Sequence, residues 1–347
     1  MLKRIVLAAG VLLGAGLAQA QEVVRLYGWE GRLAPGVIED FQKQTGIRVE
    51  YSTYSSAEEM LAGVRYDVVF PSHYQLPALI AEGRLQPLDP ARLPNLAQVN
   101  PDLLAILKSF DAQSQHAVPY LWGTVGLALN VDAITATLGE LPTDSWSLLF
   151  DEKYSERLAK CGIGLLDARE ETLSLLLNYK GSPLSRSTSR QIYRAGEELS
   201  VLRDRAASFG NASYIAPLAS GRLCLAMAWS GHVLKASEAG APLQFVTPHE
   251  GSLTFIDTMA IPRNARNVEG AYRFIDFLTS AAANTRNSRE TLFYPVIRPD
   301  APEMAKLARE RRELVVSGDQ RRSFYYLEAL SAVQKSAVDA SWSMIQR

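Results

Sequence analysis

The stretch VVRLYGWEGRLAPGVIEDFQKQTGIRVEY, residues 23–51, decides the fold class. The apolar run over residues 23–27 predicts a buried strand, and the alternation of apolar and polar residues over 47–51 predicts a second strand. Between them, Pro35 stands where a first helical turn begins, and Gly46 stands where the helix stops. This order of strand, helix and strand is typical of an open α/β protein.

Further strand signals extend this pattern along the chain. Residues 67–70 predict a third strand, which gives the order β-α-β-α-β. Two longer extended runs, residues 120–130 and residues 252–262, start about 130 residues apart, and glycines interrupt the first or precede the second. We interpret them as crossings between two lobes, which would form a hinge of more than one strand.

Aromatic and acidic side chains follow several of the predicted strands. In an open α/β protein the ligand lies at the carboxyl ends of the strands, so these side chains are expected to meet in one cleft. Aromatic faces attract cations, and carboxylates compensate for the water that an ammonium group loses, so the cleft suits a small organic cation. The residues concerned are Trp29, Glu30, Asp167, Glu170, Trp229, Phe255 and Asp257.

The first 20 residues have the features of a secretory signal peptide. Lys3 and Arg4 precede an apolar run over residues 5–17, and Ala18-Gln19-Ala20 has the small-x-small pattern of a signal-peptidase site. The apolar run is shorter than the roughly 20 residues that a transmembrane helix needs. We therefore expect export to the periplasm, cleavage after Ala20 and no membrane insertion of the mature chain.

Composition narrows the class of protein. The chain has 347 residues and 47% hydrophobic residues, as expected for a water-soluble protein large enough for two lobes. Its formal net charge is -1, and its basic residues are interleaved with acids, which argues against nucleic acid as a partner. The four histidines have no metal-binding spacing. We expect neither a metal nor another cofactor.

The two cysteines, Cys161 and Cys224, are expected to form a disulfide. An oxidising compartment favours the bond, and each cysteine starts or lies within an apolar strand, so that neighbouring strands would bring the two together. In the entropy model, closing a loop of about 60 residues contributes roughly 4 kcal/mol to stability. Two buried free thiols are the alternative.

A series of short motifs runs through nearly the whole mature chain: Leu26-Tyr27-Gly28-Trp29, Gln44-Thr45-Gly46-Ile47, Tyr66-Asp67-Val68-Val69, Pro71-Ser72, Val118-Pro119-Tyr120-Leu121-Trp122-Gly123-Thr124, Asp144-Ser145-Trp146, Cys161-Gly162, Leu166-Asp167-Ala168, Leu225-Ala226-Met227-Ala228-Trp229-Ser230-Gly231, Phe255-Ile256-Asp257 and Ala260-Ile261-Pro262. Each is weak alone, but their order and spacing are specific. The chain resembles the periplasmic spermidine/putrescine-binding proteins of ABC importers.

The resemblance implies the two-lobed α/β fold of periplasmic binding proteins. Each lobe would be a mixed sheet flanked by helices, and the ligand would close between the lobes. We expect residues 21–123 plus 252–297 to form lobe 1, and residues 124–251 plus 298–347 to form lobe 2. The expected partners are a small cationic or zwitterionic ligand and the membrane permease of an importer, and the chain is expected to be a monomer.

The resemblance also places a set of aromatic, hydroxyl and acidic residues in the ligand cleft. The aromatic side chains would enclose the methylene chain of a polyamine, and the acids would receive its ammonium groups. Asp167 has an alternative role, because an aspartate three residues before a glutamate is also typical of a helix cap. The cleft residues are Trp29, Ser72, Tyr74, Asp167, Glu170, Trp229, Phe255, Asp257 and Tyr294.

The loop after the first strand departs from the family pattern. The chain has Glu30 and Arg32 where the family commonly has a small hydroxyl residue and a tyrosine. A fixed cation disfavours an extended polyamine unless Arg32 turns outward or pairs with Glu30. Two ligand hypotheses follow: a diamine or polyamine with Arg32 neutralised locally, which we favour, or a zwitterion such as 4-aminobutyrate or 5-aminovalerate whose carboxylate binds Arg32.

Two other functions share some of these residues. A periplasmic hydrolase would need a serine and histidine pair, and Ser72-His73 or Ser230 with His232 supplies the residue types. Neither has the nucleophile-elbow pattern or an acid placed to orient the histidine, so no catalytic residue is expected. A sensor whose closed lobes engage a receptor instead of a permease would use the same cleft.

Overall fold

The computed structural model of the chain describes residues 21–347 except 57–58, 61–64, 143, 317–320 and 347. The expected signal peptide, residues 1–20, lies outside the described residues.

The first unit of the sheet forms as the sequence predicts. β1 (Val23–Trp29) lies parallel to β2 (Arg48–Tyr54), and β3 (Val68–Val69) pairs with β1 on its other side. The connection between β1 and β2 is α1 (Pro35–Thr45), which has a proline in its first turn and ends at Gly46 with a φ of 73°. Glycine adopts this left-handed conformation without steric cost, so the helix ends there.

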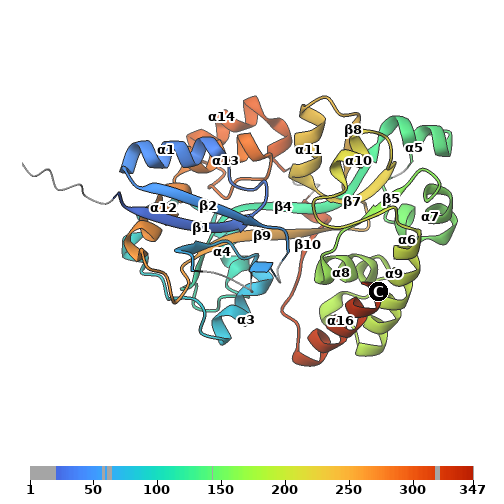
Figure 1. The fold of residues 1–347 in the computed structure, drawn as a ribbon, viewed down its shortest axis with the longest axis horizontal. Coiled ribbons are helices and arrows are strands. Elements are labelled where there is room, and N and C mark those ends of the chain that lie inside the picture. The colour runs from blue at the N-terminus through green and yellow to red at the C-terminus, as the bar shows by residue number, and fades with distance from the viewer. Residues whose placement is uncertain (1–20, 57–58, 61–64, 143, 317–320, 347) are drawn as a thin grey trace, which may run out of the picture.

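Two long antiparallel strands form the centre of the molecule. They are β4 (Ala117–Asn130) and β9 (Ser252–Ala260), and every residue in both is buried. β9 pairs with β3 on one side, whereas the second part of β4 pairs with β7 (Leu225–Trp229) and β8 (Leu243–Val246). The two strands therefore carry the sheet from one half of the molecule to the other (Figure 1), as expected for the two predicted crossings.

The described strands form one mixed sheet. Its order is β2-β1-β3-β9-β4-β7-β5-β6, with β10 added to β9 and β8 added to β4. Parallel pairs occur at both ends of this order, and antiparallel pairs join them in the middle. The remaining bounds are β5 (Ile163–Leu165), β6 (Ser208–Phe209) and β10 (Phe324–Tyr326).

Helices cover both halves of the sheet, so that the molecule has two lobes (Figure 1). With α1, one half carries α3 (Leu76–Ala81), α4 (Pro101–Leu107), α12 (Val268–Thr279), α13 (Ala281–Thr291) and α14 (Pro302–Glu310). The other half carries α5 (Val131–Leu138), α6 (Ser147–Phe150), α7 (Glu152–Leu158), α8 (Arg169–Tyr179), α9 (Ser189–Arg205), α10 (Ile215–Ala219), α11 (Ser230–Glu238) and α16 (Ala332–Ile345). The architecture is the expected α/β one, and the residue boundaries of the lobes stay a prediction.

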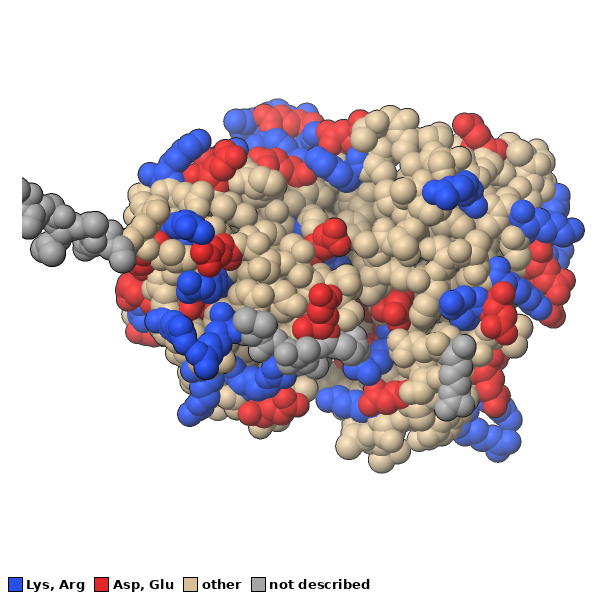
Figure 2. All heavy atoms as spheres, in the orientation of Figure 1, with Lys and Arg blue, Asp and Glu red and all other residues tan. Residues whose placement is uncertain are grey.

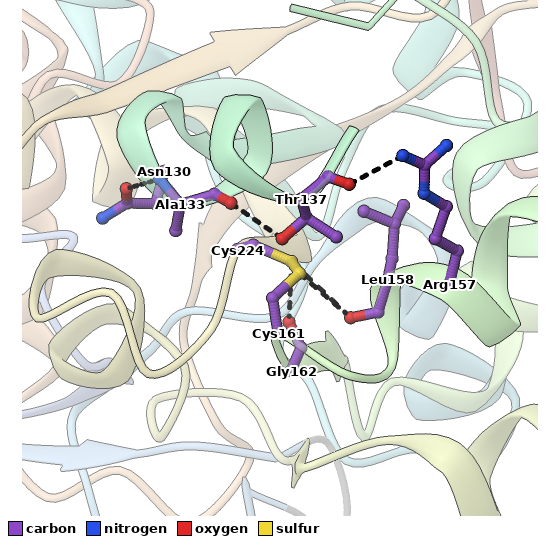
Figure 3. Close-up of a disulfide and its surroundings, with 8 residues drawn as sticks. All are labelled: Asn130, Ala133, Thr137, Arg157, Leu158, Cys161, Gly162 and Cys224. Carbon is purple, nitrogen blue, oxygen red and sulfur yellow. Dashed lines mark hydrogen bonds between the residues drawn. A yellow bond between two sulfur atoms is a disulfide. The ribbon is translucent and has the colours of Figure 1, made fainter. Parts of the chain in front are cut away.

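A disulfide joins Cys161 to Cys224, as the sequence predicts (Figure 3). The two Cα atoms are 5.6 Å apart, and the bond closes a sequence separation of 63 residues. Cys161 lies just before β5 and Cys224 just before β7, and these two strands are parallel neighbours. The bond therefore fixes the start of two adjacent strands in the half of the sheet that carries β5 and β7.

The described surface carries mixed charge. On the face shown in Figure 2, basic and acidic side chains are interspersed over both halves, and acidic side chains also occur near the middle, where the halves meet. Among the residues that the structure describes, no helix is both long and apolar enough to cross a membrane.

Candidate functional site

The loop after β1 turns one charged side chain into the interior. Gly31 has a φ of 73°, which permits a tight turn directly after Trp29-Glu30. The buried side chain of Asn287, on α13, donates to the carbonyl of Arg32 (3.1 Å) and accepts from the amide of Ala34 (2.8 Å). The loop is thus fixed from both sides, and the side chain of Arg32 is only 3% exposed.

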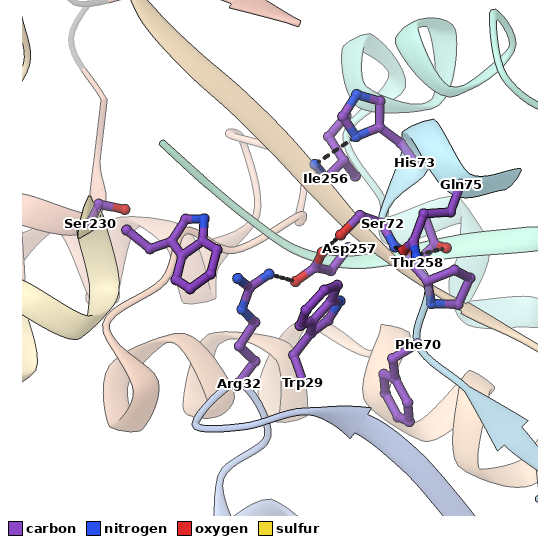
Figure 4. Close-up of polar contacts among 12 residues, drawn as sticks. Trp29, Arg32, Phe70, Ser72, His73, Gln75, Ser230, Ile256, Asp257 and Thr258 are labelled. Atoms are coloured by element: carbon purple, nitrogen blue, oxygen red, sulfur yellow. Dashed lines mark hydrogen bonds and ion pairs between the residues drawn. The ribbon is translucent and has the colours of Figure 1, made fainter. Parts of the chain in front are cut away.

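Arg32 forms a buried ion pair with Asp257 of β9 (Figure 4). Nη1 of Arg32 donates to one carboxylate oxygen, and the hydroxyl of Ser72 donates to the other oxygen at 2.5 Å. The backbone holds these partners in place, because Ser72 and Asp257 form an antiparallel bridge. Three side chains from three separate segments thereby form one polar cluster.

Four aromatic rings surround the guanidinium of Arg32. Its central carbon lies 4.5 Å from the ring centre of Phe255, 4.9 Å from Trp29, 5.0 Å from Trp229 and 5.3 Å from Phe293. All four distances are within the range of a cation–π interaction. Rings and carboxylate together form a site for a cation, and the chain's own arginine fills it.

Both members of the ion pair, Arg32 and Asp257, carry their charge. Burial disfavours a charged guanidinium, but the attraction and hydrogen bond of Asp257 outweigh burial and raise the pKa of Arg32. Burial raises the pKa of Asp257, and Arg32 and the Ser72 hydrogen bond oppose that rise. Because arginine does not lose its proton in proteins, the carboxylate that faces it is held as the anion.

Arg32 lies between two hollows in the cleft. The larger one, which we call the apolar hollow, has a volume of about 640 Å³, and the smaller one, the acidic hollow, has about 200 Å³. Trp29, Arg32, Asn211 and Trp229 line both hollows and so form the partition between them. The apolar hollow is also lined by Glu30, Leu33, Ala34, Pro35, Ala212, Ile215, His232, Lys235, Ala236 and Glu290. The acidic hollow is also lined by Ser72, Tyr74, Asp167, Arg169, Glu170, Glu171, Trp342 and Gln346.

Glu171 is the most deeply buried acid of the acidic hollow. Its side chain is 3% exposed, and one carboxylate oxygen accepts a hydrogen bond from the indole of Trp229 at 3.1 Å. Burial raises the pKa of Glu171 to about 7, against the attraction of Arg32 and the hydrogen bond from Trp229. The group is thus poised to change charge near neutral pH.

The other two acids of this hollow have local partners. Asp167 accepts hydrogen bonds from the indole of Trp342 (3.0 Å) and the amide of Gln346 (3.3 Å), both on or next to α16. Glu170 pairs with its neighbour Arg169 at 3.2 Å. The first turn of α8 and the end of α16 therefore build the acidic side of the cleft together.

The structure gathers most of the residues that the sequence nominates. Glu30 lines the apolar hollow, whereas Phe255 and Asp257 lie behind the partition, against Arg32. Tyr294 lines neither hollow and instead packs against Trp122, with the two ring centres 4.5 Å apart and the ring planes tilted by 36°. The nominated residues that line the acidic hollow are Trp29, Arg32, Ser72, Tyr74, Asp167, Glu170 and Trp229.

The structure answers two questions that the sequence leaves open. Arg32 neither turns outward nor pairs with Glu30, because the turn at Gly31 directs it toward Asp257. Asp167 does not cap α8, whose N-cap is Ala168 without a side-chain hydrogen bond, because the Asp167 carboxylate faces α16 instead.

The sequence patterns do not indicate that Glu171, Phe293 and Asn211 belong to the site, and they indicate His232 only as a possible partner of Ser230. Glu171 follows the nominated Glu170, and only the rotation of the helix decides which of two adjacent acids faces the interior. Asn211 lies on a segment without a strand-end signal, whereas Phe293 and His232 lie close to the nominated Tyr294 and Trp229, and only the fold shows that they belong to the site.

His73 and His232 are placed as structural residues. His73 is buried, its Nδ1 accepts from the backbone amide of Ile256 (3.2 Å), and burial lowers its pKa to about 3. His232 is held near the hydroxyl of Tyr214 (3.2 Å), and burial, with a smaller effect of Arg32, lowers its pKa to about 3. The hydroxyl of Ser72 donates to Asp257 and not to a histidine, so it is not arranged as a nucleophile.

Comparisons with known proteins agree with this architecture. Residues 36–311 match the family model described as bacterial extracellular solute-binding protein. The putrescine-binding periplasmic protein SpuD of Pseudomonas aeruginosa is 33% identical, over 96% of this chain and 94% of its own. PotF of Escherichia coli, also named a putrescine-binding periplasmic protein, is 31% identical over 98% of this chain and 96% of its own.

Solved structures show the same fold. The TpPotD lipoprotein of Treponema pallidum superposes with a TM-score of 0.80 at 21% identity, over 93% of this chain and 99% of its own. PotD of Streptococcus pneumoniae, a spermidine/putrescine ABC transporter substrate-binding protein, has a TM-score of 0.71 at 23% identity, over 94% and 100% of the two chains. The family match over residues 36–311, with relatives above 30% identity over nearly the whole chain, shows that the chain belongs to the bacterial extracellular solute-binding proteins.

Proposed function

We propose that this chain is the periplasmic solute-binding component of an ABC importer and that its cleft binds a diamine or polyamine. SpuD and PotF are named as periplasmic putrescine-binding proteins, and they match nearly the whole chain. The observation that carries the proposal is the acidic hollow, where carboxylates meet aromatic rings.

The charges of the acidic hollow favour a cationic ligand. Asp257 already faces Arg32, but the hydrogen bonds that Glu171 and Asp167 accept come from uncharged indole and amide groups. An ammonium group between these two carboxylates would form charge-assisted hydrogen bonds. The rings of Tyr74 and Trp229, which line the same hollow, would cover the methylene groups.

A zwitterionic amino acid is the weaker candidate. Its carboxylate would have to bind Arg32, and Arg32 is already paired with the buried carboxylate of Asp257. A second carboxylate beside that pair would bring two like charges together in a site with little water. The arrangement therefore disfavours 4-aminobutyrate and 5-aminovalerate relative to a diamine.

The proposed mechanism is closure of the two lobes on the ligand. The acidic hollow contains residues from both halves: Ser72 and Tyr74 follow β3, whereas Glu171 and Trp229 belong to α8 and β7. A ligand that contacts both sets at once stabilises the closed state by its differential affinity for that state. The permease would then recognise the closed form, and no chemical step is required of any residue.

Calorimetry on the ligand-stripped mature protein tests the proposal. Putrescine, spermidine, 4-aminobutyrate and 5-aminovalerate would each be titrated under the same conditions. We expect saturable binding of at least one of the two amines and no binding of the amino acids. Binding of the amino acids alone would overturn the amine assignment.

A variant identifies the hollow as the site. Glu171→Gln keeps the shape of the side chain and removes its charge, so amine affinity should fall by about tenfold or more. Glu39→Gln, on the exposed face of α1, removes the same charge from a side chain that lines neither hollow and should leave affinity unchanged. Uptake of labelled amine by cells with and without the gene then separates transport from a sensor role.

A further inference from the structure

We propose that Arg32 is a built-in ligand mimic: its guanidinium permanently fills the cation site formed by Asp257 and the aromatic rings, and so restricts the cleft to short diamines. This restriction rests on the proposed amine-binding function, whereas the occupancy of the site by Arg32 does not. Arg32 thereby becomes the residue that determines ligand length.

The contacts of Arg32 are those expected of a bound cation. Its guanidinium combines a buried carboxylate partner with four ring faces at 4.5 to 5.3 Å, and its side chain is 3% exposed. Trp229, which supplies one of these rings, lies on β7, in the half that does not carry the Arg32 loop. A single side chain therefore bridges the two halves as a small cationic ligand would.

The backbone keeps Arg32 in this position. The turn at Gly31 points the side chain inward, and Asn287 holds the backbone on both sides of Leu33. Because the cation is tethered at its site, its effective concentration there is high, and a free ammonium group competes poorly. Displacing Arg32 would also leave Asp257 without its partner in a buried environment.

The position of Arg32 limits the length of the ligand. The partition formed by Trp29, Arg32 and Trp229 separates the acidic hollow of about 200 Å³ from the apolar hollow of about 640 Å³. A long polyamine would have to pass a positive charge of the chain with a positive charge of its own, which like-charge repulsion opposes. A short diamine can place both ammonium groups among Asp167, Glu170 and Glu171, on one side of the partition.

Removing Arg32 should reopen the cation site. In Arg32→Ala, Asp257 and the rings remain but the guanidinium is absent, so free guanidinium ion at low millimolar concentration should bind there. We expect it to raise the melting temperature of Arg32→Ala relative to sodium chloride at equal ionic strength. It should not do so for the wild type, for the double variant Arg32→Ala/Asp257→Asn, or for Arg298→Ala, which removes an exposed arginine that lines neither hollow.

The same variant tests the restriction on length. By calorimetry, the wild type should bind putrescine more tightly than spermidine, and Arg32→Ala should shift the ratio toward spermidine by about tenfold or more. Arg32→Gln also removes the charge while retaining much of the side chain, and it should show the same shift if the alanine variant does not fold.

The outcomes separate this inference from the proposed function. If guanidinium stabilises Arg32→Ala selectively but no amine binds any form, the occupied site is supported and the amine function is overturned. The inference fails if the variants keep the wild-type preference among amines. It also fails if guanidinium has no selective effect on a folded Arg32 variant. In either case the amine function stands as long as the wild type binds an amine.

Discussion

The indole of Trp229 donates a hydrogen bond to the buried carboxylate of Glu171, at 3.1 Å, and so joins the end of β7 to the first turn of α8. The hydrogen bond favours the charged carboxylate, whereas burial disfavours it more strongly and raises the pKa of Glu171 to about 7. Ligand affinity and stability therefore both depend on this one proton.

Amine affinity should increase with pH around neutrality. A bound ammonium group requires the charged form of Glu171, and below pH 7 this form must first be produced by losing a proton. We expect affinity to fall by up to about tenfold per pH unit below pH 7. Calorimetry in buffers of different ionisation enthalpy would detect the released proton, and a pH profile identical in Glu171→Gln would contradict this assignment.

In the ligand-free protein, the contribution of Glu171 to stability should decrease as pH rises. Burial raises its pKa to about 7 in the folded state from the ordinary value of 4.5, so the folded state holds the proton more tightly. This contribution to stability is complete below pH 4.5 and decreases as pH rises toward 7. Between pH 4.5 and pH 8, the free energy of unfolding of the wild type should therefore fall by about 3 kcal/mol more than that of Glu171→Gln. Urea unfolding at both pH values measures the difference, and equal changes at both would refute it.

The buried ion pair should be sensitive to loss of one partner. Asp257→Asn leaves the guanidinium of Arg32 buried without a counter-charge and should lower the free energy of unfolding by about 3–5 kcal/mol. Arg32→Gln/Asp257→Asn removes both charges and should lose less than the sum of the single variants. Asp300→Asn, which breaks the exposed pair with Arg298, is the control and should change little. Additive effects at Arg32 and Asp257 would contradict the coupling.

The disulfide should contribute to stability but not to ligand selection. Cys161→Ser and Cys224→Ser each remove the same bond across 63 residues and should each cost about 4 kcal/mol in the entropy model. The double variant should be no less stable than either single variant, because the bond is already lost. Chemical denaturation measures all three, and a large further loss in the double variant would show that the thiols contribute in another way.

His73 and His232 should remain neutral at physiological pH. His73 and His232 have pKa values lowered to about 3, from 6.5, by burial. The unfolded chain binds protons at these residues below pH 6.5 and the folded chain does not, so their contribution to stability decreases as pH falls. NMR of the ring nitrogens should show no titration of either residue between pH 5 and 8, with His73→Gln to assign the signals. A midpoint near 6.5 would mean that the ring is exposed.

Much of the fold follows from local patterns. The β1-α1-β2 unit has its strand periods, its proline and its Gly46, and β4 and β9 fall within the two long extended runs of the sequence. The disulfide follows from two cysteines that lie next to strands expected to be neighbours. These features depend on residues close to one another in sequence or on strand neighbours, which is why the sequence is sufficient to predict them.

The interior of the site was less predictable. The direction of Arg32 depends on Asn287, which lies 255 residues away and has no motif of its own. The choice between Glu170 and Glu171 depends on how α8 is rotated, and the aromatic pattern gives no information about that angle. Phe293 contacts the guanidinium only because α13 returns the chain to the cleft. Each of these depends on tertiary packing.

The position of Arg32 in a connecting loop has an evolutionary consequence. The residue belongs to neither β1 nor α1. Asn287 holds the loop through the backbone carbonyl of residue 32 and the backbone amide of residue 34, so these contacts do not depend on the side chain at position 32. A single codon change at this position alters the charge of the cleft by one unit, while the strand register and the disulfide are untouched. After gene duplication, copies of this chain can therefore diverge in ligand preference through residue 32, once the buried carboxylate of Asp257 changes with it or gains another partner.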